Sequence, residues 1–271
     1  MIDIIVQGGM WPGTKETVKQ YARHPLVNRV VLSTWEGSSV IPAEDWDYEE
    51  FSPDQIILLK NKKPDYDGPG NLNLHLLSSR NGLANCEKDI VLKIRSDERM
   101  SDAGITTWVD FITQQSDQAT LSYLDGRLQK NKIGVIATNI NYPYHPQDHV
   151  FIGHRTDLKR LFDMPFSYEP PIGPEPVDFS TKLRNPIYIG ANYFSLFYAE
   201  AKSHLDDWKE YLLDEAPKRH EAMAFYMAHR VSIFQPLPRI QMRWEKFGCE
   251  YWWDGYHRSG DRYAEDEKQG E

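Results

Sequence analysis

The sequence has few of the features that mark secreted, membrane-spanning or disulfide-rich proteins. It holds two cysteines, Cys86 and Cys249, which are far apart and form no CxxC pair, so a reducing compartment is favoured. No apolar run approaches the roughly 20 residues that span a bilayer. The opening MIDIIVQGGMW lacks the positive flank of a signal peptide. We therefore expect a soluble, cytoplasmic protein without a transmembrane segment.

The chain also lacks an excess of positive charge and any internal repeat. Its 31 basic and 40 acidic side chains give a net charge of -9, which repels a phosphate backbone, so nucleic acid is not an expected partner. With 271 residues and 40% hydrophobic content, the chain can bury a full core. That length allows one large domain, or one domain with an appendage, and we expect the second.

Short β-branched runs alternate with amphipathic segments, a pattern typical of a sheet covered by helices. The pattern predicts six strands, at residues 2–6, 29–34, 55–59, 89–94, 133–138 and 149–152. It predicts four helices, three between these strands and one after the last, which begin near Thr14, Asn71 or Asn73, Ile105 and Asp157. The sequence therefore predicts an α/β fold.

Five prolines in residues 164–178 place a boundary there, because so many prolines exclude regular structure. We expect a catalytic domain at 1–165 and a mostly helical region at 166–271, with helices at 188–213 and 218–231. The last part is rich in aromatic residues, which could stack on acceptor sugars or close the core: Trp244, Tyr251, Trp252, Trp253 and Tyr256.

The segment 70–100 carries the most informative chemistry. The predicted strand 89–94 runs directly into Arg95-Ser96-Asp97. In an open α/β sheet, the carboxyl end of a strand lies in the crevice where ligands bind. A diphosphate leaving group is stabilised by a hard divalent cation or by Lys and Arg donors. Asp97 could hold the cation and Lys93 or Arg95 could supply the donors. Taken alone, the segment is explained equally well as a strand end with a solvated charge cluster.

The order of motifs resembles the core of GT-A glycosyltransferases, where an ARNxGL helix precedes a strand ending in Asp-x-Asp. Residues 79–83 (SRNGL) match the helix, and Arg95-Ser96-Asp97 stands in the Asp-x-Asp position. The resemblance implies a Rossmann-like mixed sheet flanked by helices, a nucleotide-sugar donor and a Mn or Mg ion. Because Arg95 replaces the first acidic residue, a metal on Asp97 would need Glu98 or Asp102.

The first 200 residues are similar to the WavE family of lipopolysaccharide-synthesis proteins. The similarity rests on IIVQGG, on VVLSTWEG and on the block from GNLNLHLLSSRNGL to LKIRSD, and continues more weakly through DHVFIGHRTDLKRLFDMP. It implies sugar transfer onto a polysaccharide, lipopolysaccharide or other glycan. The partners would then be a nucleotide-sugar and a glycan or glycolipid acceptor, which allows peripheral contact with a membrane.

Two further loops follow predicted strands and could bind the donor. Gly8 and Gly9 permit close approach of the backbone to a nucleotide, and Ser33, Thr34 and Trp35 could line the base and ribose. Plain turns would explain the same residues. We favour donor binding because both loops fall at strand carboxyl ends, beside the strand that leads to Asp97.

The start of the helix after residue 70 offers three more candidates. Asn71, Asn73 and Arg80 could face the donor sugar or phosphate, since arginine makes bidentate bonds to phosphate. Helix capping explains the two asparagines equally well.

A polar segment near residue 150 could bind metal or supply a general base, although ordinary polar edge residues are the favoured reading: His145, Asp148, His149 and His154. For an inverting enzyme we expect Asp148 to be the base, with Asp157 and Asp163 as rivals.

Two other functions remain open at this point. A sugar-phosphate nucleotidyltransferase would need a glycine-rich basic loop after the first strand, which QGGMWPGTK loosely supplies. A non-catalytic glycan-binding protein could keep the fold and lose a motif carboxylate. Glycosyl transfer is the function that we expect.

Overall fold

The computed structural model describes most of the chain. The described residues are 1–10, 13–37, 51–52, 54–114, 121–136, 138, 141–166, 180–212, 216–236, 243–246 and 249–252. For residues 69, 180–185, 243–246 and 249–252 the description covers the backbone alone.

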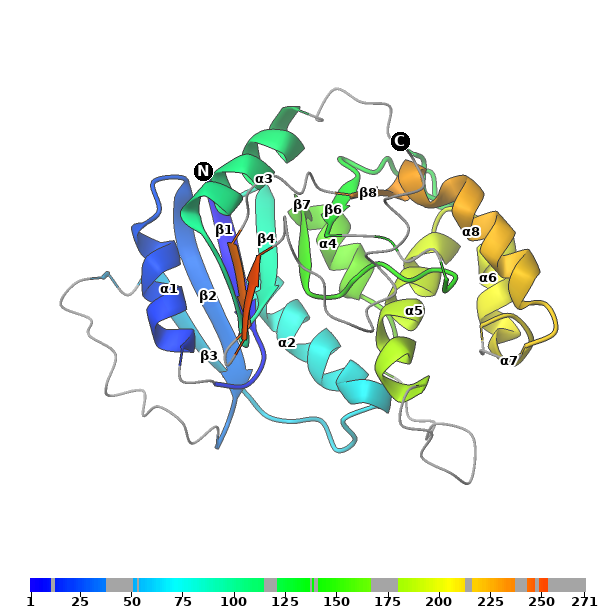
Figure 1. Ribbon diagram of the computed structural model, residues 1–271, viewed down its shortest axis with the longest axis horizontal. Helices are drawn as coiled ribbons and strands as arrows, with labels where there is room; N and C mark the ends of the chain where they lie inside the picture. The colour runs from blue at the N-terminus through cyan, green and yellow to red at the C-terminus, as the bar shows by residue number, and fades with distance from the viewer. Residues whose placement is uncertain are drawn as a thin grey trace.

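The described residues build a seven-stranded mixed sheet in the order β3-β2-β1-β4-β7-β6-β8 (Figure 1). Four neighbouring strands are parallel: β1 (Ile2–Gln7), β2 (Val27–Trp35), β3 (Ile56–Asn61) and β4 (Ile90–Arg95). β7 (Val150–His154) runs antiparallel to β4 and to β6 (Ile133–Val135). β8 (Phe234–Pro236) closes the edge, parallel to β6. The mixed α/β sheet predicted from the sequence is confirmed.

Helices cover both faces of the sheet, and each face has its own core. The α1 (Thr14–Arg23) and α3 (Asp102–Gln114) helices pack on the face that holds Ile4. The α2 (Leu72–Ala84) and α4 (Arg155–Phe162) helices pack on the face that holds Ile5. Because side chains alternate along a strand, β1 contributes side chains to both cores and is buried on both sides.

The C-terminal part is mostly helical, as expected, and lies beyond β6 and β8 in Figure 1. It consists of α5 (Ser180–Ser195), α6 (Ala199–Asp206), α7 (Trp208–Tyr211) and α8 (Arg219–Ile233). The helix predicted at 188–213 is therefore three helices, whereas α8 matches the prediction at 218–231. One core cluster joins these helices to the sheet, and β8 adds a strand to it. A separate domain at 166–271 stays a prediction.

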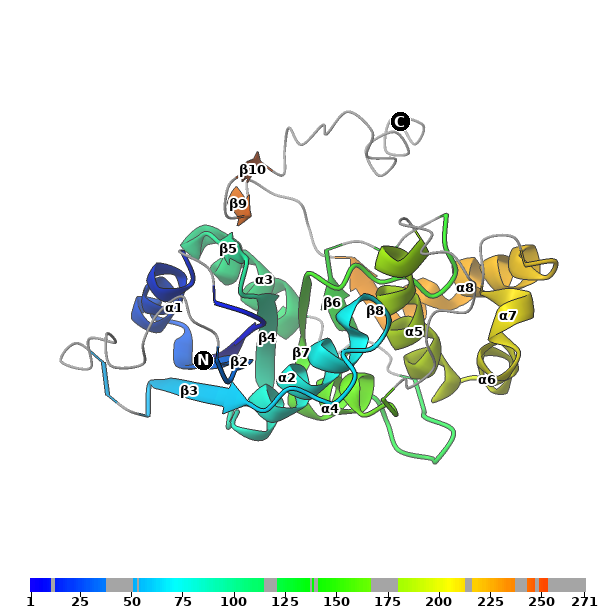
Figure 2. The same ribbon diagram turned by 90° about the horizontal axis from the view of Figure 1, so that it is seen from below.

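A small second sheet follows β4 (Figure 2). In it, β9 (Arg243–Lys246) pairs antiparallel with β5 (Glu98–Met100) and with β10 (Cys249–Trp252). Of the aromatic residues that could stack on sugars or close the core, Trp244, Tyr251 and Trp252 lie in strands whose side chains are not described. Trp253 and Tyr256 lie outside the described residues.

The helix starts differ from the predicted caps. Gly13 occupies the cap position of α1, and Thr14 Oγ1 instead donates to the Ser96 carbonyl at 2.9 Å. Asn71 occupies the cap position of α2, but its side chain makes no capping bond and its φ is 64°. Within the described part of the chain, no helix has the length and apolar character needed to cross a membrane.

Candidate functional site

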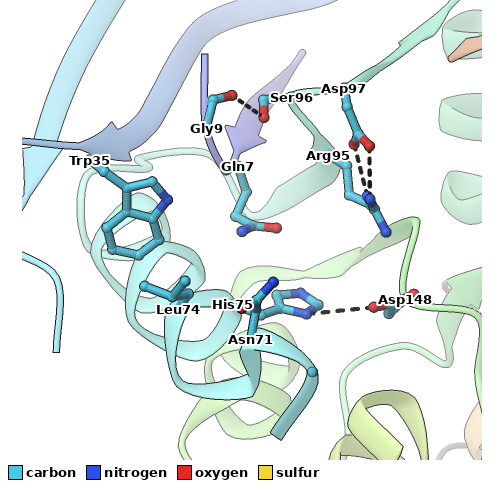
Figure 3. Close-up of a pocket in the computed structure, with 12 residues that line it drawn as sticks. Gln7, Gly9, Trp35, Asn71, Leu74, His75, Arg95, Ser96, Asp97 and Asp148 are labelled. Atoms are coloured by element: carbon cyan, nitrogen blue, oxygen red, sulfur yellow. Dashed lines mark hydrogen bonds and ion pairs between the residues drawn. The ribbon is translucent and has the colours of Figure 1, made fainter. Parts of the chain in front are cut away.

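A cavity of about 230 Å³ opens at the carboxyl ends of β1, β2 and β4 (Figure 3). β1 pairs with β2 on one side and with β4 on the other, so the order of the strands along the chain reverses at β1. Such a topological switch point is where α/β sheets bind ligands. Seven of the residues predicted to bind ligand line this cavity: Gly8, Gly9, Trp35, Asn71, Arg95, Asp97 and Asp148.

The turns after β1 and β4 are joined through Ser96. Gly8 has a φ of 129°, and a Cβ at that position would lie 2.6 Å from Ser96 Oγ. Ser96 Oγ donates to the Gly9 carbonyl at 2.5 Å, and the Ser96 carbonyl accepts from Thr14. Glycine is required at position 8 for both its backbone conformation and this close approach. These contacts fix the wall of the cavity before any ligand arrives.

Arg95 and Asp97 form a two-point ion pair beside that wall. Arg95 Nε donates to Asp97 Oδ1 and Nη2 donates to Oδ2, both at 2.8 Å. The Arg95 side chain is 34% exposed and that of Asp97 is 11% exposed. Burial alone would lower the pKa of Arg95, but the bond to Asp97 and the charge of Glu98 raise it overall. Arg95 is therefore a fixed cation with open access to the cavity.

Asp148 enters the site from the loop before β7. Because β7 is antiparallel to β4, with Val150 opposite Ile94, the residues before Val150 lie next to the end of β4. Asp148 Oδ2 lies 3.8 Å from His75 Nδ1 on α2 (Figure 3). Burial would raise the pKa of Asp148, but the positive charges around it, led by His149 and Arg95, hold it well below its ordinary value. Asp148 is thus ionised at neutral pH.

Two buried bases with lowered pKa values adjoin the cavity, Lys93 behind its wall and His75 in its lining. Lys93 Nζ donates to the Asp148 carbonyl at 2.9 Å, and burial lowers the pKa of Lys93 to about 7. Burial, followed by the charge of Lys93, lowers the pKa of His75 well below its ordinary value. At neutral pH the permanent cation of the cavity wall is therefore Arg95, while His75 is neutral.

A second pair, between buried Glu98 and partly exposed His149, adjoins Arg95. Glu98 is fully buried, its Oε1 contacts His149 Nδ1 and lies 3.9 Å from Arg95 Nε. Burial alone would lower the pKa of His149, but Glu98 raises it. Glu98 therefore contacts His149 and lies near Arg95 at the end of β4.

The donor set around Asp97 does not fit a divalent metal. Both Asp97 oxygens accept from Arg95, Glu98 Oε1 contacts His149, and Asp102 Oδ1 accepts from Gln20 Nε2 at 2.7 Å. The described ranges hold no group of three His, Cys, Asp or Glu side chains placed to bind one ion. The expected metal on Asp97, assisted by Glu98 or Asp102, would therefore compete with Arg95 for Asp97, and the Glu98 oxygen that accepts no hydrogen bond from the described residues, Oε2, is buried.

Some predicted donor-binding residues make structural contacts outside this cavity. Ser33 Oγ donates to the Ser78 carbonyl at 2.7 Å, and Thr34 is buried. Asn73 is buried, and its Nδ2 donates to the Tyr66 carbonyl at 3.0 Å. Ser33, Thr34 and Asn73 are absent from the cavity lining, which places them in the support of the strands and of the loop before α2.

Arg80 also lies away from the cavity. Its Nε donates to the Phe162 carbonyl at 2.7 Å, and its Nη2 contacts the Met164 carbonyl. Arg80 is five residues beyond His75, which is about 7.5 Å farther along the helix axis. Its contacts fasten α2 to the end of α4. Lys93, too, stands behind the cavity wall rather than in it.

The polar segment 145–154 divides among several roles. His145 is buried, and His154 caps α4 by accepting from the Thr156 backbone N–H at 3.2 Å. The rival base Asp157 is buried and accepts from Tyr123 Oη at 2.8 Å. Its companion Asp163 is exposed at the end of α4. Of the three candidate bases, Asp148 is the one that lines the cavity.

Five lining residues were missed by sequence reasoning: Gln7, Gly70, Leu74, His75 and Ser96. His75 could have been found, because it lies four residues after Asn71 and therefore shares its helix face. Gln7 directly follows the strand predicted at 2–6 and precedes the two glycines; in the structure it is the last residue of β1. Gly70, with a φ of 57°, precedes the left-handed Asn71, so two unusual backbone conformations meet at the cavity.

Comparison with known proteins gives a family match and distant structural similarities. The family model for WavE lipopolysaccharide synthesis matches residues 9–228. No curated protein sequence matches the chain. S. aureus TarS 1–349 is 13% identical in sequence. The match covers 85% of this chain and 72% of the TarS chain, with a TM-score of 0.41. HddC from Yersinia pseudotuberculosis is 12% identical, covering 64% of this chain and 85% of its own, with a TM-score of 0.34.

The match to the family extends from the turn after β1, through the cavity residues on β4, α2 and the loop before β7, into α8. It thus includes Arg95, Asp97 and Asp148 and spans well over half of the sequence. The chain belongs to the WavE lipopolysaccharide synthesis family.

Proposed function

We propose that the protein is a GT-A-type glycosyltransferase that moves a sugar from a nucleotide-sugar donor onto a lipopolysaccharide or other glycan in the cytoplasm. Family membership supports a function in glycosyl transfer or nucleotide-sugar chemistry. One observation carries the proposal further: the switch-point cavity gathers an aromatic ring, a glycine turn, a fixed cation and an ionised carboxylate. A nucleotide-sugar has a matching set of groups.

The cavity suggests an orientation for the donor. Trp35 and Arg95 lie on opposite sides of it (Figure 3). Trp35 offers a flat apolar face for the base, and Gly8 and Gly9 leave room beside the ribose and phosphates. Arg95 suits the diphosphate, because guanidinium groups bind phosphate oxygens in a two-point geometry. The sugar would then lie between the start of α2 and Asp148.

The proposed reaction is attack of an acceptor hydroxyl on the anomeric carbon. The bond from that carbon to the diphosphate oxygen breaks, and its electron pair leaves with the nucleoside diphosphate toward Arg95. Asp148 accepts the proton of the attacking hydroxyl. Its lowered pKa makes Asp148 a weak base, so its contribution should fall at the lower end of the roughly 10²- to 10⁴-fold range of general base catalysis.

The first test is a search for turnover with UDP, GDP, CMP and dTDP sugars and a lipopolysaccharide-core acceptor. Release of the nucleoside phosphate with sugar on the acceptor supports the proposal. Release of pyrophosphate from a sugar phosphate and a nucleoside triphosphate would instead identify a nucleotidyltransferase. Binding of glycan without turnover of any donor would identify a glycan-binding protein.

The second test removes the partner of Arg95. Asp97→Ala should abolish donor turnover and leave the fold intact, because Arg95 loses the carboxylate that fixes its direction. Asp125→Ala is the matched control, since Asp125 also pairs with an arginine two residues away, Arg127, on the surface. Full activity in Asp97→Ala would contradict the assignment of this site.

A further inference from the structure

We propose that Arg95 takes the place of a divalent metal in this site: its guanidinium binds the donor diphosphate, and Asp97 positions Arg95 instead of ligating an ion. This inference rests on the proposed glycosyl transfer and specifies how its leaving group is stabilised. It predicts that donor binding and cleavage need no metal.

Asp97 is already bound by Arg95. Its two carboxylate oxygens each accept a bond of 2.8 Å from Arg95, so both lone-pair directions that face Arg95 are taken. A metal on Asp97 would have to break this pair and lie beside a positive guanidinium, which repels it. The pair is also largely shielded from water on the Asp97 side, where the side chain is 11% exposed. Asp97 is therefore committed to Arg95.

Among the described residues, no group of three His, Cys, Asp or Glu side chains is placed to hold an ion beside Asp97. Glu98 Oε1 contacts His149, whereas Glu98 Oε2 accepts no hydrogen bond from the described part of the chain but is buried, and Glu98 is not among the residues that line the cavity. Asp148 faces the cavity from the loop before β7, where the charges of neighbouring side chains, led by His149 and Arg95, hold its pKa well below its ordinary value. Hard divalent cations take about six oxygen ligands and favour several carboxylates. In the described part of the site, Asp97 pairs with Arg95 and Glu98 contacts His149, so both carboxylates have partners within the protein.

Arg95 keeps N–H donors with which it can bind a ligand. A guanidinium has five N–H donors, and the pair with Asp97 uses two of them, which leaves 5 - 2 = 3. Its side chain lines the cavity and is 34% exposed. A cation fixed in direction before the reaction stabilises the charge that develops on the leaving diphosphate. Arg95 stays protonated throughout, and the acceptor proton goes to Asp148.

The experiment measures binding of UDP, GDP and dTDP to the full chain by calorimetry, in EDTA and in millimolar Mn²⁺. We expect at least one diphosphate to bind the wild-type protein with dissociation constants that agree within about twofold in the two buffers. Arg95→Gln should weaken that binding by roughly tenfold or more, the loss expected for a charge-assisted hydrogen bond. Arg127→Gln, on the exposed surface pair, should bind as the wild type does.

A second variant tests the exchange of cation directly. Arg95→Asp creates the sequence Asp-Ser-Asp at 95–97, and its diphosphate binding should appear when Mn²⁺ is added and vanish in EDTA. Arg127→Asp, which creates Asp-Gly-Asp at 125–127, should bind equally in both buffers. Circular dichroism checks that each variant folds. If Arg95→Asp does not fold, the wild-type titrations in EDTA and in Mn²⁺ decide whether the site needs a metal.

The outcomes separate this inference from the function on which it rests. Wild-type binding that requires Mn²⁺ would overturn the metal-free site and leave glycosyl transfer standing. A folded Arg95→Asp variant that ignores Mn²⁺ would also count against the exchange. No binding of any diphosphate in either buffer would contradict the donor site itself, and the inference would fall with it.

Discussion

Gly190 in α5 lies directly against the backbone carbonyl of Tyr144, so closely that a Cβ on Gly190 would overlap this oxygen. Tyr144 has a φ of 54°, an unfavourable backbone conformation for an aromatic residue, and its hydroxyl lies 2.6 Å from His204 Nδ1. Tyr144 is four residues before Asp148. The C-terminal helices therefore hold the loop that brings Asp148 to the cavity.

Gly190→Ala should move this loop and weaken the protein. We expect a loss of about 1–3 kcal/mol in the free energy of unfolding, the range for overpacking, together with slower sugar transfer. Gly153→Ala is the control, because a Cβ on Gly153 would meet Ile133 at an ordinary 3.5 Å. Urea unfolding and initial rates measure the two effects. Equal stability and rates in both variants would show that α5 does not position the loop.

Asp148→Asn should slow transfer by about 100-fold and leave nucleoside diphosphate binding in place, because the amide cannot accept the proton. Asp163→Asn is the control, since Asp163 is exposed at the end of α4. Single-turnover rates with saturating donor separate the chemical step from binding. An Asp148→Asn enzyme as fast as the control would remove Asp148 from the proton transfer.

Arg80→Ala distinguishes the sequence prediction from the structure. Donor binding by Arg80 would require a large loss of affinity for diphosphate in this variant. From its bonds to the Phe162 and Met164 carbonyls, we expect a loss of stability of about 1–3 kcal/mol and an unchanged dissociation constant. Chemical unfolding and calorimetry on the same preparation measure both quantities. A tenfold loss of affinity in a stable variant would restore the sequence prediction.

Lys93 should make stability depend on pH in an alkaline window. Its pKa is about 7 in the fold and 10.5 in the unfolded chain, mainly because it is buried. Between those values the unfolded chain binds the proton and the folded protein does not, so stability rises with pH. Below pH 7 both states are protonated and this contribution is constant.

The variant Lys93→Met isolates that effect. The pKa of His149 is also shifted in the fold, but His149 is present in both proteins, so its contribution cancels in the comparison. From pH 7.5 to 9, the wild type should gain roughly 2 kcal/mol of unfolding free energy relative to Lys93→Met, at about 1.4 kcal/mol per pH unit. Urea unfolding at a series of pH values gives the difference. A difference that is flat across this window would mean that Lys93 titrates at its ordinary pKa.

Sequence patterns predicted the parts of the site that depend on strand ends. The apolar runs at 2–6 and 89–94 became β1 and β4, and the residues after them, Gly8, Gly9 and Arg95, meet in one cavity. This follows because parallel strands bring their carboxyl ends to the same edge. The sites of β6 and β7 were also predicted, although β6 ends at Val135 instead of residue 138.

Side-chain directions and long-range contacts were harder to predict. Ser33 and Trp35 are two residues apart and share one face of β2, yet Ser33 bonds to α2, whereas Trp35, the last residue of the strand, lines the cavity. The pairing of Asp97 with Arg95, and not with an ion, depends on side-chain geometry that spacing leaves open. The contact of Gly190 with Tyr144 joins segments on both sides of the proline-rich stretch, so local patterns contain no trace of it.

The central claim is that the cavity beside β1 and β4 binds the donor, and Gly9 offers the most direct test. A Cβ on Gly9 would meet no atom within 4 Å, so Gly9→Leu should fold normally while its side chain obstructs the cavity that Gly9 lines. Calorimetric titration of UDP, GDP, CMP and dTDP sugars should show binding of at least one donor to the wild type and its loss in Gly9→Leu. Equal binding to both proteins would contradict the account.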